Sequence, residues 1–161
     1  MKKRLIAFIY ALFATLIMPT RVGAYDEREA KMNVILVKYH SPMAGLEPAL
    51  IKLAEEKGLD WTLLAAIAGT ESSFGKRMPH ECLNPYGWGI YGDNKLCFES
   101  FEKAALAVAD GISKKYNTTT LETIARTYNK VSTEGWIRHT RFFMNKIKSA
   151  EIPVHALPIT L

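Results

Sequence analysis

The sequence lacks most of the features that mark repeat proteins, low-complexity chains and zinc-binding modules. It contains no internal repeat and no low-complexity tract, and its only long apolar run lies near the amino terminus. It has only two cysteines, and they do not form the closely spaced pair that zinc sites use. A chain of 161 residues is long enough for one domain once a targeting segment is removed. We therefore expect a single domain.

The first 24 residues have the pattern of a signal peptide. Residues 2–4 are basic, residues 5–18 are apolar, and small residues at 22–24 suit a cut after Ala24. A retained membrane anchor is the alternative, but it needs about 20 apolar residues, and this run is shorter. No cysteine lies near the cut, so we expect no lipid attachment. The pattern predicts export to the periplasm, the cell wall or the extracellular space, with membrane contact only before cleavage.

Most of the positive charge of the chain belongs to this segment. The formal net charge is +5, and Lys2, Lys3, Arg4 and Arg21 precede the cut without any acidic residue. The loss of these four cations leaves the mature chain at +1. A nearly neutral domain gives no electrostatic reason to expect nucleic acid as a partner.

Both cysteines, Cys82 and Cys97, lie in the mature part of the chain. Because exported proteins form disulfides, we expect a Cys82–Cys97 bond. It would close a loop of 16 residues and stabilise the fold by about 3 kcal/mol in the chain-entropy model. The alternative is a metal site made by residues 80–82 and Cys97. No second ligand pair supports it, so we expect neither a metal nor another cofactor.

Hydrophobic periodicity in the first half of the mature chain predicts helices. Residues 26–40 indicate a short leading helix, and residues 46–58 a longer one, with Pro48 in its first turn and Gly58 at its end. A third helix is expected at 61–72, where Asp60 suits the capping position. This segment is apolar on almost every side, so it should be central and buried.

The second half predicts three more helices after one long irregular segment. Residues 73–98 carry glycine, proline, asparagine and aromatics without a helical period, and long loops of this kind in compact domains are usually functional. Helices are then expected at 100–116 with Ser100 as the cap, after a capping box of Thr119 and Glu122, and at about 134–149. The expected fold class is therefore all-α, with one irregular loop closed by the disulfide.

These elements divide the mature chain into three parts. We expect an amino-terminal leader at residues 25–45, a helical domain at 46–149 and a peripheral tail at 150–161.

Glu71 is the first candidate for chemistry because it ends the apolar helix at 61–72. Its spacing from Leu64 and Ile67 places it on the buried face of that helix. Burial raises the pKa of a carboxyl group, which suits a general acid. From the helix pattern alone, an ordinary exposed glutamate at a helix end is the simpler interpretation.

Three sequence blocks give Glu71 a context. They are "TESSFG" at residues 70–75, "NPYGWGIYG" at 84–92 and "IARTYN" at 124–129. In this order they resemble the glutamate–serine motif, the glycine-rich cleft segment and the tyrosine–asparagine motif of soluble lytic transglycosylases and goose-type lysozymes. The resemblance covers roughly residues 46–147.

The resemblance implies a lysozyme-like helical fold and peptidoglycan glycan strands as the partner of a monomeric enzyme. It implies Glu71 as the catalytic acid and base, Ser73 near a polar position that orients the substrate or the glutamate, and Tyr128 near the cleft tyrosine. The sequence departs from the family pattern at residues 87–90, Gly-Trp-Gly-Ile in place of Gly-Leu-Met-Gln. It departs again at Lys130 and Val131, which replace Ala-Gly.

The same blocks also resemble the N-acetylglucosaminidase family of autolysins, and "CFESFEKA" at residues 97–104 fits a further block of that family. Two-carboxylate hydrolysis needs a second acid about 5–9.5 Å from the first, for which Glu81, Asp93 and Glu99 are the candidates. The lytic transglycosylase scheme needs Glu71 alone. A third interpretation is a glycan-binding module on the same fold without catalysis.

Aromatic residues in the irregular loop are the candidates for sugar binding. Tyr86, Trp88 and Tyr91 alternate with glycines, which let the backbone approach a ligand closely. We expect these three, with Tyr128, to line a substrate cleft. The alternative is that Trp88 packs into the core beneath the loop. Trp136 and Phe143, at helical spacing, are expected in the core.

Overall fold

A computed structural model describes residues 25–79, 81–90, 92, 94–115, 120–129 and 131–153. The predicted signal peptide and most of the predicted tail lie outside these residues. The described part is all-α without a strand, as expected. Its helices are α2 (Glu27–Lys38), α3 (Glu47–Glu56), α4 (Leu63–Ser72), α5 (Phe101–Lys115), α6 (Leu121–Tyr128) and α7 (Thr133–Lys148). No helix in these ranges is both long enough and apolar enough to cross a membrane.

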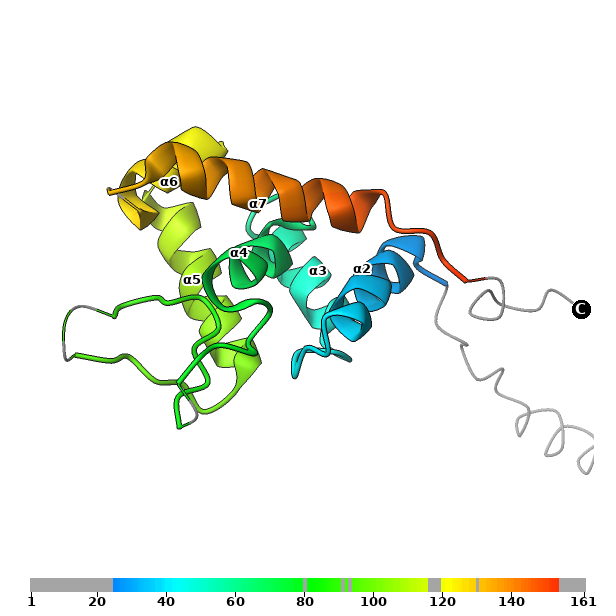
Figure 1. The fold of residues 1–161 in the computed structure, drawn as a ribbon, viewed down its shortest axis with the longest axis horizontal. Coiled ribbons are helices and arrows are strands. Elements are labelled where there is room, and N and C mark those ends of the chain that lie inside the picture. Colours follow the sequence, from blue (N-terminus) through cyan, green and yellow to red (C-terminus); the bar gives the residue numbers. More distant parts are fainter. Residues whose placement is uncertain are drawn as a thin grey trace, which may run out of the picture.

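Helix α4 lies at the centre of the bundle. Residues 63–69 are all buried, because a helix that is apolar on every side can be stable only when other elements surround it. Figure 1 shows α7 running across α4, with α6 near the start of α7 and α2 near its end. Helix α3 completes the packing by contacting α2, α4 and α5. The buried central helix predicted from the sequence is therefore confirmed.

Most of the predicted helix ends are confirmed, and two caps are corrected. Ser100 Oγ accepts the Lys103 N–H at 3.2 Å, as expected of the α5 cap. Thr120, and not Thr119, caps α6, and its hydroxyl accepts the Thr123 N–H at 3.3 Å. Asp60 accepts the N–H of Thr62 at 2.9 Å, but α4 begins at Leu63 with Thr62 as its N-cap. Asp60 therefore stabilises the turn before the helix.

A sharp turn follows α4. Ser73, Phe74 and Gly75 have φ values of +52°, +58° and +86°, a left-handed conformation that costs a side-chain-bearing residue about 1–2 kcal/mol. The buried hydroxyl of Ser72 offsets this cost, because it donates to Pro85 O at 2.6 Å and accepts the Gly75 N–H at 2.8 Å. Ser72 therefore holds both the turn and the irregular loop.

The irregular loop at residues 73–98 is cross-linked to itself. The predicted Cys82–Cys97 disulfide is confirmed, with Cα atoms 4.7 Å apart. Asn84, which is buried, donates to the carbonyl oxygens of Trp88 at 2.8 Å and Leu96 at 2.7 Å, and it accepts the Trp88 N–H at 3.2 Å. These bonds satisfy backbone groups that have no helical partner. The described residues of the loop can consequently position side chains against α4 and α5.

Candidate functional site

Glu71 lies in the last turn of α4 and meets two other segments of the chain. Its Oε1 accepts a hydrogen bond of 2.7 Å from the indole Nε1 of Trp136 on α7. Its Oε2 faces Gly87 of the irregular loop closely enough that a Cβ on Gly87 would stand 3.3 Å from it. The site thus draws on three segments that lie far apart in the sequence.

The electrostatic environment of Glu71 favours a proton on its carboxyl group. Burial against the neighbouring side chains raises the pKa of Glu71, and the Trp136 N–H opposes this effect only in part. The residue as a whole is nevertheless exposed, which corrects the expectation that it lies on the buried face of its helix. Its neighbours crowd the carboxyl group, but solvent reaches it. A protonatable group that a ligand can reach fits the requirements of a general acid.

Three aromatic rings form a row beside this carboxyl group. The rings of Trp136 and Tyr128 are stacked, with centroids 5.1 Å apart and planes 28° apart. Trp88 also contacts Tyr128, with ring centroids 5.5 Å apart and planes inclined by 50°. Trp136 is buried, whereas Trp88 is partly exposed. We call Trp88, Tyr128 and Trp136 the aromatic row.

Tyr128 also connects the row to the irregular loop. Its hydroxyl donates to the main-chain oxygen of Tyr86 at 2.7 Å. Burial, followed by the charge of Glu71, raises the pKa of Tyr128. Tyr128 therefore stays neutral and keeps its proton for this hydrogen bond.

The structure brings together some of the residues expected at the site and separates others. Glu71, Trp88 and Tyr128 lie in one region, and partly exposed Ser73 caps the helix that carries Glu71. Trp88 also packs against the core, with its indole ring on Gly111 of α5, so the alternative position expected for it is borne out in part. Tyr86 was expected in a cleft wall, but its side chain is fully buried in the core, and only its main-chain oxygen takes part. Tyr91 lies outside the described residues.

Trp136 is a site residue that its sequence pattern did not reveal. Its spacing predicted a core position, and it is indeed 3% exposed. A buried tryptophan, however, brings an N–H group that needs an acceptor. Pairing this unmet donor with the one acid that ends an apolar helix would have pointed to the contact with Glu71.

The three candidates for a second carboxylate remain unsupported or undescribed. Glu81, in the irregular loop, and Glu99, just after it, are exposed, and Asp93 lies outside the described residues. In the described part of the chain, burial raises the pKa of Glu71 and the Trp136 bond lowers it, and no second acid contributes to the shift. The same part contains no cluster of three histidine, cysteine or acidic side chains that could hold a metal.

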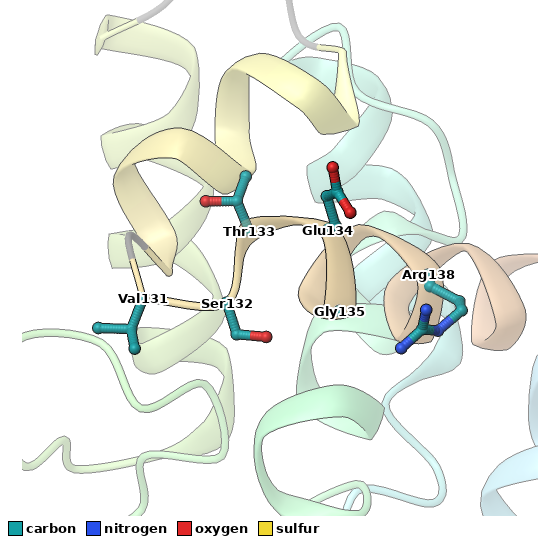
Figure 2. A pocket seen from close by; sticks show the side chains of 6 residues that line it. All are labelled: Val131, Ser132, Thr133, Glu134, Gly135 and Arg138. Atoms are coloured by element: carbon teal, nitrogen blue, oxygen red, sulfur yellow. The ribbon is translucent and has the colours of Figure 1, made fainter.

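A shallow pocket of about 470 Å³ lies at the start of α7. Figure 2 shows its lining from residues 131–135 and Arg138. Gly135, in this lining, directly precedes Trp136. One lining residue is therefore the sequence neighbour of a member of the aromatic row. The lining is mostly polar.

Comparisons of this chain with models of protein families, with curated proteins and with solved structures found no match. The function must consequently be argued from the residues and their geometry.

Proposed function

We propose that this protein is an exported, peptidoglycan-cleaving glycosidase of the lytic transglycosylase type. It would break the β-1,4 bond between N-acetylmuramic acid and N-acetylglucosamine with Glu71 as the only acid and base. The observation that carries the proposal is the crowded but accessible carboxyl group of Glu71, whose pKa is raised by burial and which Trp136 holds by one oxygen. The three sequence blocks that resemble lytic transglycosylases support the same assignment.

The proposed reaction needs no group other than this carboxyl and the substrate. Protonated Glu71 gives its proton to the glycosidic oxygen, and the bond between that oxygen and C1 breaks with its electron pair moving to the oxygen. The carboxylate then takes the proton of the C6 hydroxyl of the same sugar, whose oxygen forms a bond to C1. The products are a 1,6-anhydro sugar and a free hydroxyl end, and Glu71 is protonated again.

The raised pKa of Glu71 suits this double role. A general acid works best when its pKa lies near the pH at which it operates, and the crowding of Glu71 moves its pKa upward, toward neutral pH. The positive charge that develops at C1 is stabilised by the N-acetyl group of the substrate. This scheme makes one carboxylate sufficient.

The aromatic row supports binding of a glycan strand. Aromatic faces pack against the apolar faces of sugar rings. Partly exposed Trp88 contacts Tyr128 in the aromatic row, and Trp136 of the same row binds Glu71. A non-catalytic glycan-binding module would use the same surface, but it would have no need to crowd a carboxyl group. Removing part of the water around a carboxyl group is unfavourable, so the crowding of Glu71 favours the enzyme over the binding module.

The hydrolase is the second candidate, because Asp93, Glu81 and Glu99 all belong to the irregular loop or its end, and this loop contacts the site. A digest of peptidoglycan by residues 25–161, with products identified by mass, separates the possibilities. We expect 1,6-anhydro products from the wild type and none from Glu71→Gln. Glu81→Gln and Glu99→Gln, which each remove one exposed carboxylate, should keep the activity.

The other outcomes each have a meaning. Products that carry an added water, with loss of activity in one of the loop variants, would identify a hydrolase with a second carboxylate. Binding to peptidoglycan without cleavage by either the wild type or Glu71→Gln would leave a binding module. Unchanged cleavage by Glu71→Gln would refute the role of Glu71.

A further inference from the structure

The two oxygens of Glu71 have different surroundings. Oε1 accepts the Trp136 indole N–H at 2.7 Å. Oε2 faces the backbone of Gly87, where even a methyl group would come within 3.3 Å. The two oxygens are equivalent in a free carboxylate, but the protein makes them unequal.

The identity of the donor decides where a proton can sit. An indole N–H can only donate a hydrogen bond, so the atom it binds must act as an acceptor. In a protonated carboxyl group the carbonyl oxygen is the better acceptor. A proton on Glu71 is therefore placed on Oε2, and Oε1 remains the carbonyl oxygen bonded to Trp136.

Trp136 is itself held in place. It is 3% exposed, and its ring stacks on that of Tyr128 at 5.1 Å. The Tyr128 hydroxyl donates to the main-chain oxygen of Tyr86 at 2.7 Å, and Tyr86 directly precedes Gly87. The residues that hold Oε1 therefore also hold the backbone that faces Oε2, because Trp136 stacks on Tyr128 and Tyr128 binds the residue before Gly87.

We propose that Trp136 is a positioning residue that holds Glu71 Oε1 and so assigns Oε2, beside Gly87, as the oxygen that gives and takes the proton. This inference rests on the proposed function of Glu71 as acid and base. Gly87 has the complementary role of leaving room at Oε2. Its φ of +60° suits glycine, and a side chain would occupy the space that a glycosidic oxygen needs.

The first test measures the link between Trp136 and Glu71 directly, without any substrate. The side-chain carboxyl carbon of Glu71 and the indole N–H groups of the three tryptophans are followed by NMR against pH. We expect the Trp136 indole signal to shift with the same pKa as the Glu71 carboxyl carbon. Trp136→Phe should raise that pKa, because it removes the one interaction that lowers it. Trp61→Phe, outside the site, should leave it unchanged.

A benzothienylalanine in place of Trp136 keeps the shape of the side chain and removes only the N–H group, which guards against a folding defect in Trp136→Phe. An unchanged Glu71 pKa in this folded variant would overturn the proposal. So would an indole signal of Trp136 that does not respond to the titration of Glu71.

The second test measures cleavage. Losing a hydrogen bond to a charged group should lower kcat for the benzothienylalanine variant about ten-fold or more. It should also shift the alkaline limb of the pH profile to higher pH, because Glu71 must be protonated to start the reaction. A proportional loss of activity at every pH, with no shift, would contradict the positioning role.

Gly87→Ala tests the oxygen assignment, and Gly92→Ala is its matched control. Gly92 has a φ of +56°, and a Cβ added to it would meet nothing within 4 Å, so both variants strain the same loop but only one crowds Oε2. We expect Gly87→Ala to lose at least about ten-fold more kcat than Gly92→Ala. Equal losses would overturn the assignment of Oε2.

The two levels of the proposal fail in different ways. If the wild type cleaves no glycan, the proposed function fails, and the NMR titration alone decides whether Trp136 positions Glu71. If the wild type cleaves and the titration shows no coupling, only the role of Trp136 fails.

Discussion

Gly111 offers the sharpest test of how the irregular loop is packed. It lies inside α5, and the indole ring of Trp88 rests against it. A Cβ on Gly111 would stand 2.3 Å from Trp88 Cζ2 and 2.7 Å from Cη2, far inside the roughly 3.5–4.0 Å at which carbon atoms attract. Gly111→Ala therefore cannot be accommodated without moving Trp88.

The expected magnitude is the balance of two effects. Alanine in place of glycine within a helix normally stabilises a protein by about 1 kcal/mol. Overpacking of a well-packed region costs about 1–3 kcal/mol. The main chain of Trp88 is held in place, because Asn84 binds both its N–H and its carbonyl oxygen, so the side chain has to absorb the clash. We expect Gly111→Ala to lower the free energy of unfolding by about 1 kcal/mol in total.

Urea unfolding of a double-mutant cycle measures this balance. In the Trp88→Ala background the clash is absent, so Gly111→Ala should then stabilise the protein by about 1 kcal/mol. The same substitution would thus change sign with the residue at position 88. Gly111→Ala that stabilises the wild-type protein would refute the contact between the loop and α5.

Two further predictions concern the site and its loop. Glu71→Gln should raise the midpoint of thermal unfolding at neutral pH, because burial raises the pKa of Glu71 above its ordinary 4.5 and so destabilises the folded, ionised protein. Calorimetry should show that this gain in the midpoint vanishes below pH 4.5, where the carboxyl group is neutral in the folded and the unfolded state. An equal gain at every pH would contradict this cause. Reduction of the Cys82–Cys97 bond should lower the free energy of unfolding by about 3 kcal/mol, as measured by urea titration with and without a reducing agent. A change of less than about 1 kcal/mol would show that the other loop contacts hold the loop without the disulfide.

The sequence predicted the helices well because their signals are local. The apolar run at 61–72 and the periodic segments around it need only their own residues to indicate helix and burial. The disulfide could be predicted equally well, since a signal-peptide pattern and two cysteines leave one pairing. The predicted caps, Asp60 and Thr119, lie two positions and one position before the observed caps, Thr62 and Thr120. Neighbouring threonines and aspartate offer similar hydroxyl and carboxylate acceptors, so the sequence does not distinguish them.

The site could be predicted only in part because its decisive contacts are between distant segments. Glu71 and Trp136 are 65 residues apart in the sequence, and no local pattern links them. Tyr86 was expected to bind substrate because it stands among glycines, but those glycines also let the loop fold back and bury the ring. An aromatic residue in a loop can therefore be recognised from sequence, whereas the side it faces cannot.

Three glycines make room for side chains of other segments, and only one of them lies in a sequence block that resembles a known family. A Cβ would stand 2.8 Å from Phe74 at Gly69, 2.3 Å from Trp88 at Gly111 and 3.3 Å from the Glu71 carboxylate at Gly87. At each position the missing side chain makes room for a ring or a carboxyl group that belongs to another segment. Gly87 lies inside a recognisable sequence block, whereas Gly69 and Gly111 sit in ordinary helices, where glycine is usually unfavourable. Two of these three spaces therefore lie on helices, outside the sequence blocks. A substitution at Gly111 should displace Trp88 without changing any residue of those blocks.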